Sequence, residues 1–162
     1  MGIAALAPLL IWFLKPSVPL ISDRRCYTES VYIFHEKDQD VVRVSRYWTL
    51  TSKGEGTGSY YATLLFYRNG EIVDRKELAR ALNFTVKPLR HALSVKVDSV
   101  SWLSGIKNEE AKYRPYLDPL LYPGFSIGVS LFTPGNEVLL TGLAGRPRTF
   151  CNPHEKMIFP AI

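Results

Sequence analysis

Apolar and polar side chains alternate at every second position along much of the chain, and this period predicts β-strands. Five runs carry the alternation, at residues 42–50, 60–67, 82–86, 93–97 and 125–131. The run at 60–67 is apolar on both faces, so we expect that strand to be covered on both sides. Asn69-Gly70 follows it directly and provides the positive φ angles of a tight hairpin turn. A second turn is expected at 133–136, before a further strand.

The intervals between these runs give further expectations. The alternation shifts phase after Val97, to Val100 and Trp102, which indicates a β-bulge at Ser99. Residues 74–82 and 107–113 are rich in helix formers and predict short helices. The proline-rich stretch 115–124 is expected to be an irregular connection, forming a pocket wall or a partner contact. The pattern as a whole predicts a mainly β fold: an antiparallel sheet forming a lipocalin-like barrel or half-barrel, with one or two short helices.

The first 14 residues form an uncharged apolar run, and apolar residues continue to Ile21 beyond Lys15. A membrane span needs about 20 residues, a length reached if Lys15 extends toward the headgroups. A cleaved signal peptide would need a basic start and a small-residue cleavage site, neither of which is present. A buried N-terminal helix or strand is the remaining alternative. We expect an uncleaved membrane anchor at 1–21 and a β-rich domain at 22–162.

The two cysteines, Cys26 and Cys151, stand near the two ends of the expected domain. They form no C-x-x-C motif, so neither a zinc knuckle nor a thioredoxin-like site is predicted. We favour a disulfide between them, with two buried free thiols as the alternative. A disulfide persists in an oxidising compartment, which favours a bacterial inner-membrane protein whose bulk lies in the periplasm. The positive charges that follow the apolar run favour the opposite orientation, and we give the cysteines more weight.

Charge and motifs argue against several classes of function. The net charge is +5 over 162 residues, but the basic residues are scattered and form no stripe for nucleic acid. The three histidines have no metal-ligand spacing, so no metal and no cofactor are expected. Gly54 to Gly58 lacks the third glycine of a dinucleotide fingerprint. Ser126 lies in a G-x-S-x-G motif, but too little chain follows for a hydrolase sheet, so we expect no enzyme.

The run Arg25-Cys26-Tyr27-Thr28-Glu29-Ser30-Val31-Tyr32-Ile33-Phe34, the apolar start and the bracketing cysteines resemble the PsaF/MyfF family, and more distantly ToxS-like proteins. The resemblance implies an accessory protein of the inner membrane that stabilises or activates a membrane-spanning ToxR-like transcription regulator of fimbrial (pH 6 antigen-type) genes. The two periplasmic domains would form a heterodimer. In related pairs the two domains form a joint β-barrel, and some of these barrels bind a small lipid-like ligand. The family offers no motif by which site residues carry over. A stand-alone lipocalin-like binder of a small apolar ligand is the alternative.

The resemblance implies a response to acid or temperature, and histidine is the side chain that changes charge near neutral pH. His35 is the first candidate pH-sensing residue and His91 the second. His35 shares a strand face with Val31 and Ile33, which predicts that it is partly buried. A buried neutral histidine would make acid destabilising, whereas a histidine that faces a carboxylate would make acid strengthen the complex.

Overall fold

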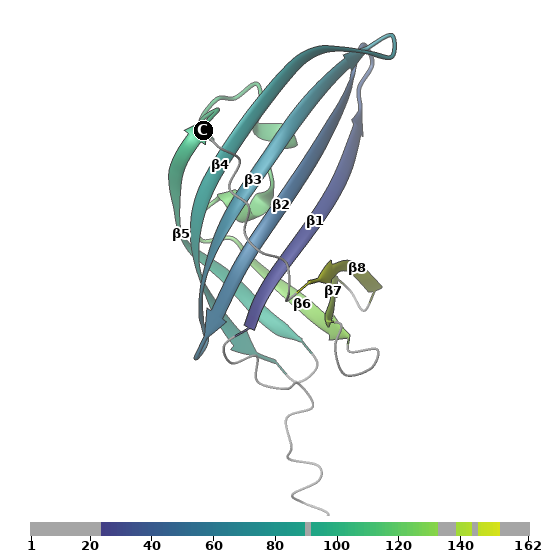
Figure 1. The fold of residues 1–162 in the computed structure, drawn as a ribbon. Coiled ribbons are helices and arrows are strands. Elements are labelled where there is room, and N and C mark those ends of the chain that lie inside the picture. Colours follow the sequence, from purple (N-terminus) through teal and green to yellow (C-terminus); the bar gives the residue numbers. More distant parts are fainter. Residues whose placement is uncertain (1–23, 90–91, 133–138, 144–145, 153–162) are drawn as a thin grey trace, which may run out of the picture.

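The computed structural model describes residues 24–89, 92–132, 139–143 and 146–152, and these form one antiparallel sheet (Figure 1). Each strand pairs with the next along the chain, in the order β1 to β8. Two short 3-10 helices, η1 and η2, interrupt the connection between β5 and β6. The elements are β1 (Arg24–His35), β2 (Asp40–Ser52), β3 (Glu55–Arg68), β4 (Glu71–Pro88), β5 (Leu93–Gly105), η1 (Arg114–Tyr116), η2 (Pro119–Leu121), β6 (Ser126–Phe132), β7 (Leu139–Leu143) and β8 (Arg146–Cys151).

The long strands β1 to β5 curve into a half-barrel, as Figure 1 shows. The mainly β, antiparallel half-barrel expected from the sequence is therefore confirmed. The first and last strands meet at a single bridge, in which Tyr27 and Asn152 exchange both backbone hydrogen bonds. This bridge connects the two borders of the sheet only near the start of β1, at Tyr27.

Two tight turns set the register of β2, β3 and β4. Asn69 and Gly70 have φ angles of 52° and 82°, which confirms the predicted hairpin turn between β3 and β4. Lys53 and Gly54 make the same kind of turn between β2 and β3, with φ angles of 49° and 86°. In each turn both central residues have positive φ. This backbone conformation has a twist that matches that of the flanking strands.

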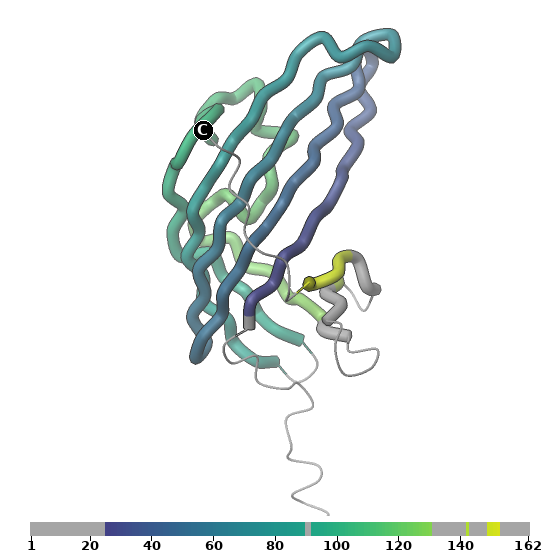
Figure 2. The backbone as a smooth tube through the Cα atoms, in the orientation of Figure 1, coloured from purple at the N-terminus to yellow at the C-terminus, as the bar shows by residue number. Residues whose placement is uncertain are grey.

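The core lies on the concave face of the half-barrel, where the β5–β6 connection packs against the sheet. In Figure 2 this connection is the green segment behind the long strands. In one core cluster, Leu117 and Leu121 of the connection pack against residues of β3 and β4. In a second cluster, Tyr113 and Tyr116 pack against residues of β2 and β3. The buried residues that the sheet contributes to the two clusters are Val41, Tyr60, Ala62, Leu64, Phe66, Leu78, Leu82 and Phe84.

Both helix predictions were wrong. Residues 74–82 belong to β4, because alternate side chains at Leu78, Arg80 and Leu82 turn toward the concave face and are buried there. This tertiary packing outweighs the high helix propensity of these residues. Residues 107–113 form turns, and the regular turns that follow are 3-10 helices with proline in their first turn. The stretch 115–124 is an irregular connection, as predicted.

The predicted bulge in β5 is present one residue from the expected position. Asn83 pairs with Ser99 and Phe84 with Val97, so Asp98 is the extra residue. A second irregularity, which the sequence did not indicate, leaves Leu103 unpaired opposite Ala79 and Arg80. The expected anchor at 1–21 and the expected turn at 133–136 lie outside the described residues. Within the described part of the chain, no helix has the length and apolar character needed to cross a membrane.

Candidate functional site

A disulfide between Cys26 and Cys151 ties β1 to β8 beside the Tyr27–Asn152 bridge. The two Cα atoms are 5.0 Å apart and the two residues are separated by 125 positions in the sequence. The predicted bond is therefore present. By the chain-entropy model a loop of this order contributes about 4–5 kcal/mol to stability. The disulfide holds the first and last strands of the described sheet together.

The outer edge of β1 is free of strand pairing over most of its length. Beyond the Asn152 bridge at Tyr27, the outer side of residues 29–35 is paired with no other strand of the described chain. Val31 and Ile33 are each 58% exposed there. Natural edge strands are generally blunted by charge, proline or a bulge. Residues 30–34 carry none of these, so this edge is suited to adding a strand.

The upper half of β5 offers a second edge. Its first residues, Leu93 to Lys96, pair with β6, and Val97 exchanges backbone bonds with Gly124 and Phe125. From Asp98 to Gly105 the described residues supply no outer strand. Trp102 and Leu103 are half-exposed there, at 56% and 50%. Large apolar side chains on a free strand edge are a common signature of a protein-binding surface.

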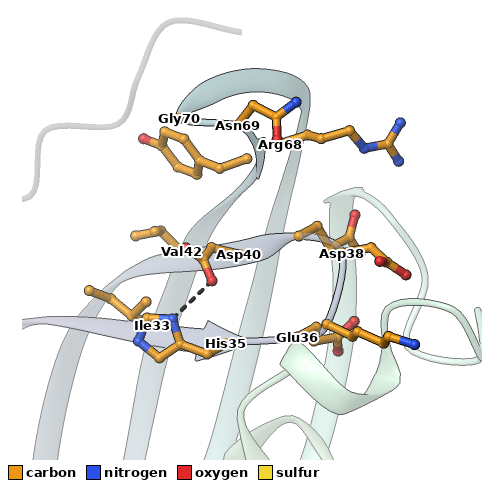
Figure 3. Close-up of a pocket in the computed structure, with 12 residues that line it drawn as sticks. Ile33, His35, Glu36, Asp38, Asp40, Val42, Arg68, Asn69 and Gly70 are labelled. Atoms are coloured by element: carbon orange, nitrogen blue, oxygen red, sulfur yellow. Dashed lines mark hydrogen bonds and ion pairs between the residues drawn. The ribbon is translucent and has the colours of Figure 1, made fainter.

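His35 lies at the end of β1, on the convex face that also carries Val31 and Ile33. Its Nδ1 is 2.9 Å from Oδ1 of Asp40, the residue opposite it on β2 (Figure 3). The expected partial burial was wrong, because the His35 side chain is 77% exposed. The convex face of β1 has no layer over it in the described structure, so sharing a face with Val31 and Ile33 brings no burial. His91, the second candidate, lies outside the described residues.

The two hairpin tips frame an open pocket around His35 (Figure 3). The β1–β2 turn contributes Glu36 to Asp40, and the β3–β4 turn contributes Arg68 to Gly70. Glu36 also accepts a hydrogen bond of 2.5 Å from the Tyr116 hydroxyl on the concave side. The pocket therefore holds charges of both signs and has no nucleophile paired with a base. It can place charged groups beside the β1 edge.

A buried ion pair is the most unusual feature of the concave face. Arg43 on β2 is 5% exposed at its side chain, and its Nη2 is 3.3 Å from Oδ2 of Asp118. Its Nη1 donates to the carbonyl of Tyr116 at 2.8 Å, and its guanidinium stacks over the rings of Tyr32 and Phe34. The pair therefore fastens the β5–β6 connection to the sheet. Sequence reasoning missed Arg43, because an arginine within a strand is ordinarily assigned to the solvent face.

Tyrosine hydroxyls surround the same place. Those of Tyr47 and Tyr60 are buried and make no hydrogen bond of acceptable geometry among the described residues, although Asp118 lies near both of them and Ser45 lies near Tyr60. Burial is the largest cause that raises the pKa of Tyr47, and nearby Tyr60 and Asp118 raise it further. Burial also raises the pKa of Tyr60, against the opposing effect of Arg43. Both tyrosines remain neutral at physiological pH and add further polar groups to the interior around the Arg43–Asp118 pair.

A second buried arginine holds the other end of the connection. The Arg80 side chain donates to Oδ1 of Asn108 at 2.9 and 3.0 Å and to the carbonyl of Ser104 at 2.9 Å. Asn108 in turn donates to the carbonyl of Leu121 at 2.8 Å. Burial lowers the pKa of Arg80 from its usual value. Arg80 therefore has a structural role, fixing the turn after β5.

Other candidate chemistry finds little support in the described residues. Across these residues, no three His, Cys, Asp or Glu side chains gather as they would around a metal ion. Ser126 begins β6 at an exposed position, and Glu137 and His154, the residues that would complete a triad, lie outside the described residues. Comparisons with family models, curated proteins and solved structures find no match to this chain.

Proposed function

We propose that this chain is a periplasmic accessory protein that stabilises or activates a membrane-spanning ToxR-like transcription regulator of fimbrial genes. Residues 1–21 would anchor it in the inner membrane, and the β-rich domain would bind the regulator's periplasmic domain. The chain would act by association, with neither catalysis nor direct DNA contact. The resemblance at residues 25–34 suggests this role, and the Cys26–Cys151 disulfide is compatible with an oxidising compartment.

The observation that carries the proposal is the free upper edge of β5. It exposes Trp102 and Leu103 next to a half-barrel that one further strand would extend. Strand addition binds a partner through main-chain hydrogen bonds, and alternate side chains provide the specificity. Aromatic side chains such as Trp102 are typical of binding hot spots. We infer that the regulator contributes a strand here and extends the half-barrel toward a joint, lipocalin-like barrel.

The test is co-purification of the full chain with its regulator from membranes. Trp102→Glu and Leu103→Glu should each lower recovery of the regulator at least tenfold, as expected for the loss of a hot-spot contact of about 1.4 kcal/mol or more. Ile72→Glu is the matched control, because Ile72 is a strand residue that is 55% exposed away from this edge. Equal binding by all three variants would exclude the β5 edge as the contact.

The regulatory part of the proposal needs a separate readout. Deleting the gene should lower fimbrial transcription while the messenger RNA of the regulator stays constant, because the chain protects the regulator protein. Salt-dependent binding of promoter DNA by the isolated chain would contradict this class of function.

A stand-alone binder of a small ligand is the second candidate. It is favoured by the buried hydroxyls of Tyr47, Tyr60 and Tyr122, which make no hydrogen bond of acceptable geometry among the described residues. Buried polar groups are ordinarily satisfied by protein, water or a ligand. Native mass spectrometry of the purified chain should then show a bound small molecule that is lost from the Tyr47→Phe/Tyr60→Phe variant. An unliganded mass for the unmodified chain would reject this candidate.

A further inference from the structure

The free edge of β1 is independent of the proposed regulator contact, because β1 and β5 lie at different borders of the half-barrel (Figure 1). Tyr27 directs both its N–H and its carbonyl outward, to Asn152. In an antiparallel ladder these directions alternate along a strand, so Glu29, Val31, Ile33 and His35 direct their backbone groups outward as well. The same residues place their side chains on the convex face, because opposite residues of paired strands share a face and their partners on β2 lie on the convex face. The edge therefore presents a row of backbone groups ready for another strand.

The order of side chains along this edge is self-complementary. We propose that two copies of this chain pair antiparallel along β1, with Tyr32 of one copy opposite Tyr32 of the other. Val31 then lies opposite Ile33 of the other copy, and Glu29 lies opposite His35. All four of these residues are in the phase that exchanges both backbone hydrogen bonds. The two-fold symmetry makes each contact occur twice, as in any isologous interface.

The neighbouring strand extends this match. Within one chain Val44 is opposite Val31, and Val42 is opposite Ile33. Pairing two copies would place these four side-chain positions in an unbroken apolar row across four strands of the convex face. Cross-strand contacts between β-branched residues stabilise sheets. Exposed Val31 and Ile33 would become covered by their counterparts.

The charged residues fall into an equally regular row. Glu29 is already held by Arg46 of β2 at 3.4 Å, and His35 by Asp40 of β2 at 2.9 Å. In the paired sheet the order across four strands becomes Arg46, Glu29, then His35 and Asp40 of the other copy. When His35 is protonated, the signs alternate along the whole row.

Shifting the register by two residues breaks the charge match and leaves one apolar pair instead of two. In one direction Val31 would oppose Val31 while Ile33 opposes Glu29 of the other copy, and in the other direction Ile33 would oppose Ile33 while Val31 opposes His35. A shift by one residue would set a convex side chain against a concave one. The sequence of β1 therefore favours a second copy of this chain in a single register. This symmetry is not expected of an unrelated partner strand.

Protonation of His35 should strengthen this pairing. The groups that face His35 within its own chain are Asp40 on β2, the acidic and basic residues of the adjoining β1–β2 turn (Glu36, Lys37 and Asp38), and Arg68 at the β3–β4 tip. Glu29 of the other copy would add a further negative charge, and Arg46 and Tyr27 already contact that carboxylate. Two exposed ion pairs then form in each dimer. Their combined effect is about a fivefold increase in affinity.

The test is cysteine cross-linking of the full chain in membranes from cells that lack the regulator. Residues at a non-hydrogen-bonded antiparallel pair have Cα atoms about 4.5 Å apart, within the range that a disulfide spans. Tyr32→Cys should therefore cross-link to itself and give a species of twice the chain mass. Ile72→Cys, at an exposed strand position elsewhere, is the control and should remain monomeric.

Two further variants keep the register testable if Tyr32→Cys folds poorly. Val31→Cys and Ile33→Cys should cross-link when co-expressed, and poorly when either is expressed alone. Self-linking of either variant alone would overturn the register, and monomers throughout would overturn the dimer. A third outcome is possible, in which these cysteines cross-link to the regulator in cells that contain it but do not cross-link to each other in cells that lack it. The β1 edge would then be a binding site for the regulator, and the dimer would be rejected.

The role of His35 has its own readout. Disulfide formation is slower at pH 6 than at pH 8, because less of each thiol is ionised, and this effect is the same with or without His35. The Val31→Cys and Ile33→Cys pair should therefore cross-link about five times more efficiently at pH 6 than the same pair carrying His35→Gln in both chains, and equally well at pH 8. Equal cross-linking of the two pairs at pH 6 would remove His35 from the interface. Loss of regulator binding through Trp102→Glu leaves this test unaffected, so the two proposals fail separately.

Discussion

Replacing Asp118 by Asn isolates the contribution of the buried ion pair. The asparagine side chain would keep the carbonyl oxygen that accepts from the Leu120 backbone N–H at 3.0 Å, so the cap of η2 survives. The substitution removes only the negative charge that lies 3.3 Å from Arg43. Arg43 would then be a buried cation whose remaining partners are the Tyr116 carbonyl and two aromatic rings.

Removing one partner of a buried ion pair destabilises proteins by about 3–5 kcal/mol. The Tyr116 carbonyl and the rings of Tyr32 and Phe34 still compensate part of the Arg43 charge. We therefore expect a loss of about 3 kcal/mol in the free energy of unfolding for Asp118→Asn. Asp118→Ala should lose about 1 kcal/mol more, because the helix cap is also removed.

Urea unfolding of the full chain in a mild detergent, followed by tryptophan fluorescence, measures both losses. Asp38→Asn is the matched control, because Asp38 lies in the exposed β1–β2 turn and should change stability by less than about 0.5 kcal/mol. The double variant Arg43→Met/Asp118→Asn should be more stable than Asp118→Asn alone, since it leaves no uncompensated charge. A cost below about 1 kcal/mol for Asp118→Asn would refute the assignment of Asp118 as the essential counter-ion of Arg43.

Two other predictions concern the concave face. Gly56→Ala should destabilise the fold by about 1–3 kcal/mol, because the new Cβ would lie 2.0 Å from the Phe84 ring. Adding Phe84→Leu to this variant should recover part of the loss, as measured by urea unfolding. If the stability losses of the two substitutions simply add in the double variant, this contact is contradicted. Stability should also fall at alkaline pH, because the raised pKa values of Tyr47 and Tyr60 keep both protonated in the folded state. The unfolded chain binds fewer protons above its tyrosine pKa of about 10, so stability is retained below that pH and falls above it by up to about 1.4 kcal/mol per pH unit for each tyrosine. Tyr47→Phe/Tyr60→Phe should flatten the decline measured by unfolding between pH 9 and 11, and an unchanged slope would mean that other groups cause it.

Local patterns in the sequence predicted parts of β2 to β7, the Asn69-Gly70 turn and the β5 bulge, although they assigned residues 74–82 of β4 to a helix. They were insufficient where a distant segment decides the environment. In β2 the apolar residues Val42, Val44 and Trp48 form the outer face, whereas Arg43 and Ser45 point inward and are buried. This inversion depends on Asp118 and Tyr116, which arrive from the β5–β6 connection about 70 residues later. No periodicity within β2 can report a counter-ion supplied from there.

The exposure of His35 eluded prediction for a related reason. Alternation shows which residues share a face of a strand, and here it placed His35 correctly with Val31 and Ile33. It does not show whether another layer of the protein covers that face. The free edges of β1 and β5 were likewise undetectable from the sequence, because an edge is defined by a neighbour that the chain does not supply.

The strand order has a consequence for how the chain folds. Every strand pairs with its neighbour in sequence, so each hairpin can form as soon as its second strand has emerged during synthesis. The contact between β1 and β8 has to wait for Cys151, which follows Cys26 by 125 residues. With only two cysteines in the chain, no mispaired intramolecular bond is available while the sheet grows. Formation of the disulfide would therefore be a late step, and a pulse-labelled chain should acquire protease resistance in the β2–β4 region before it acquires the bond.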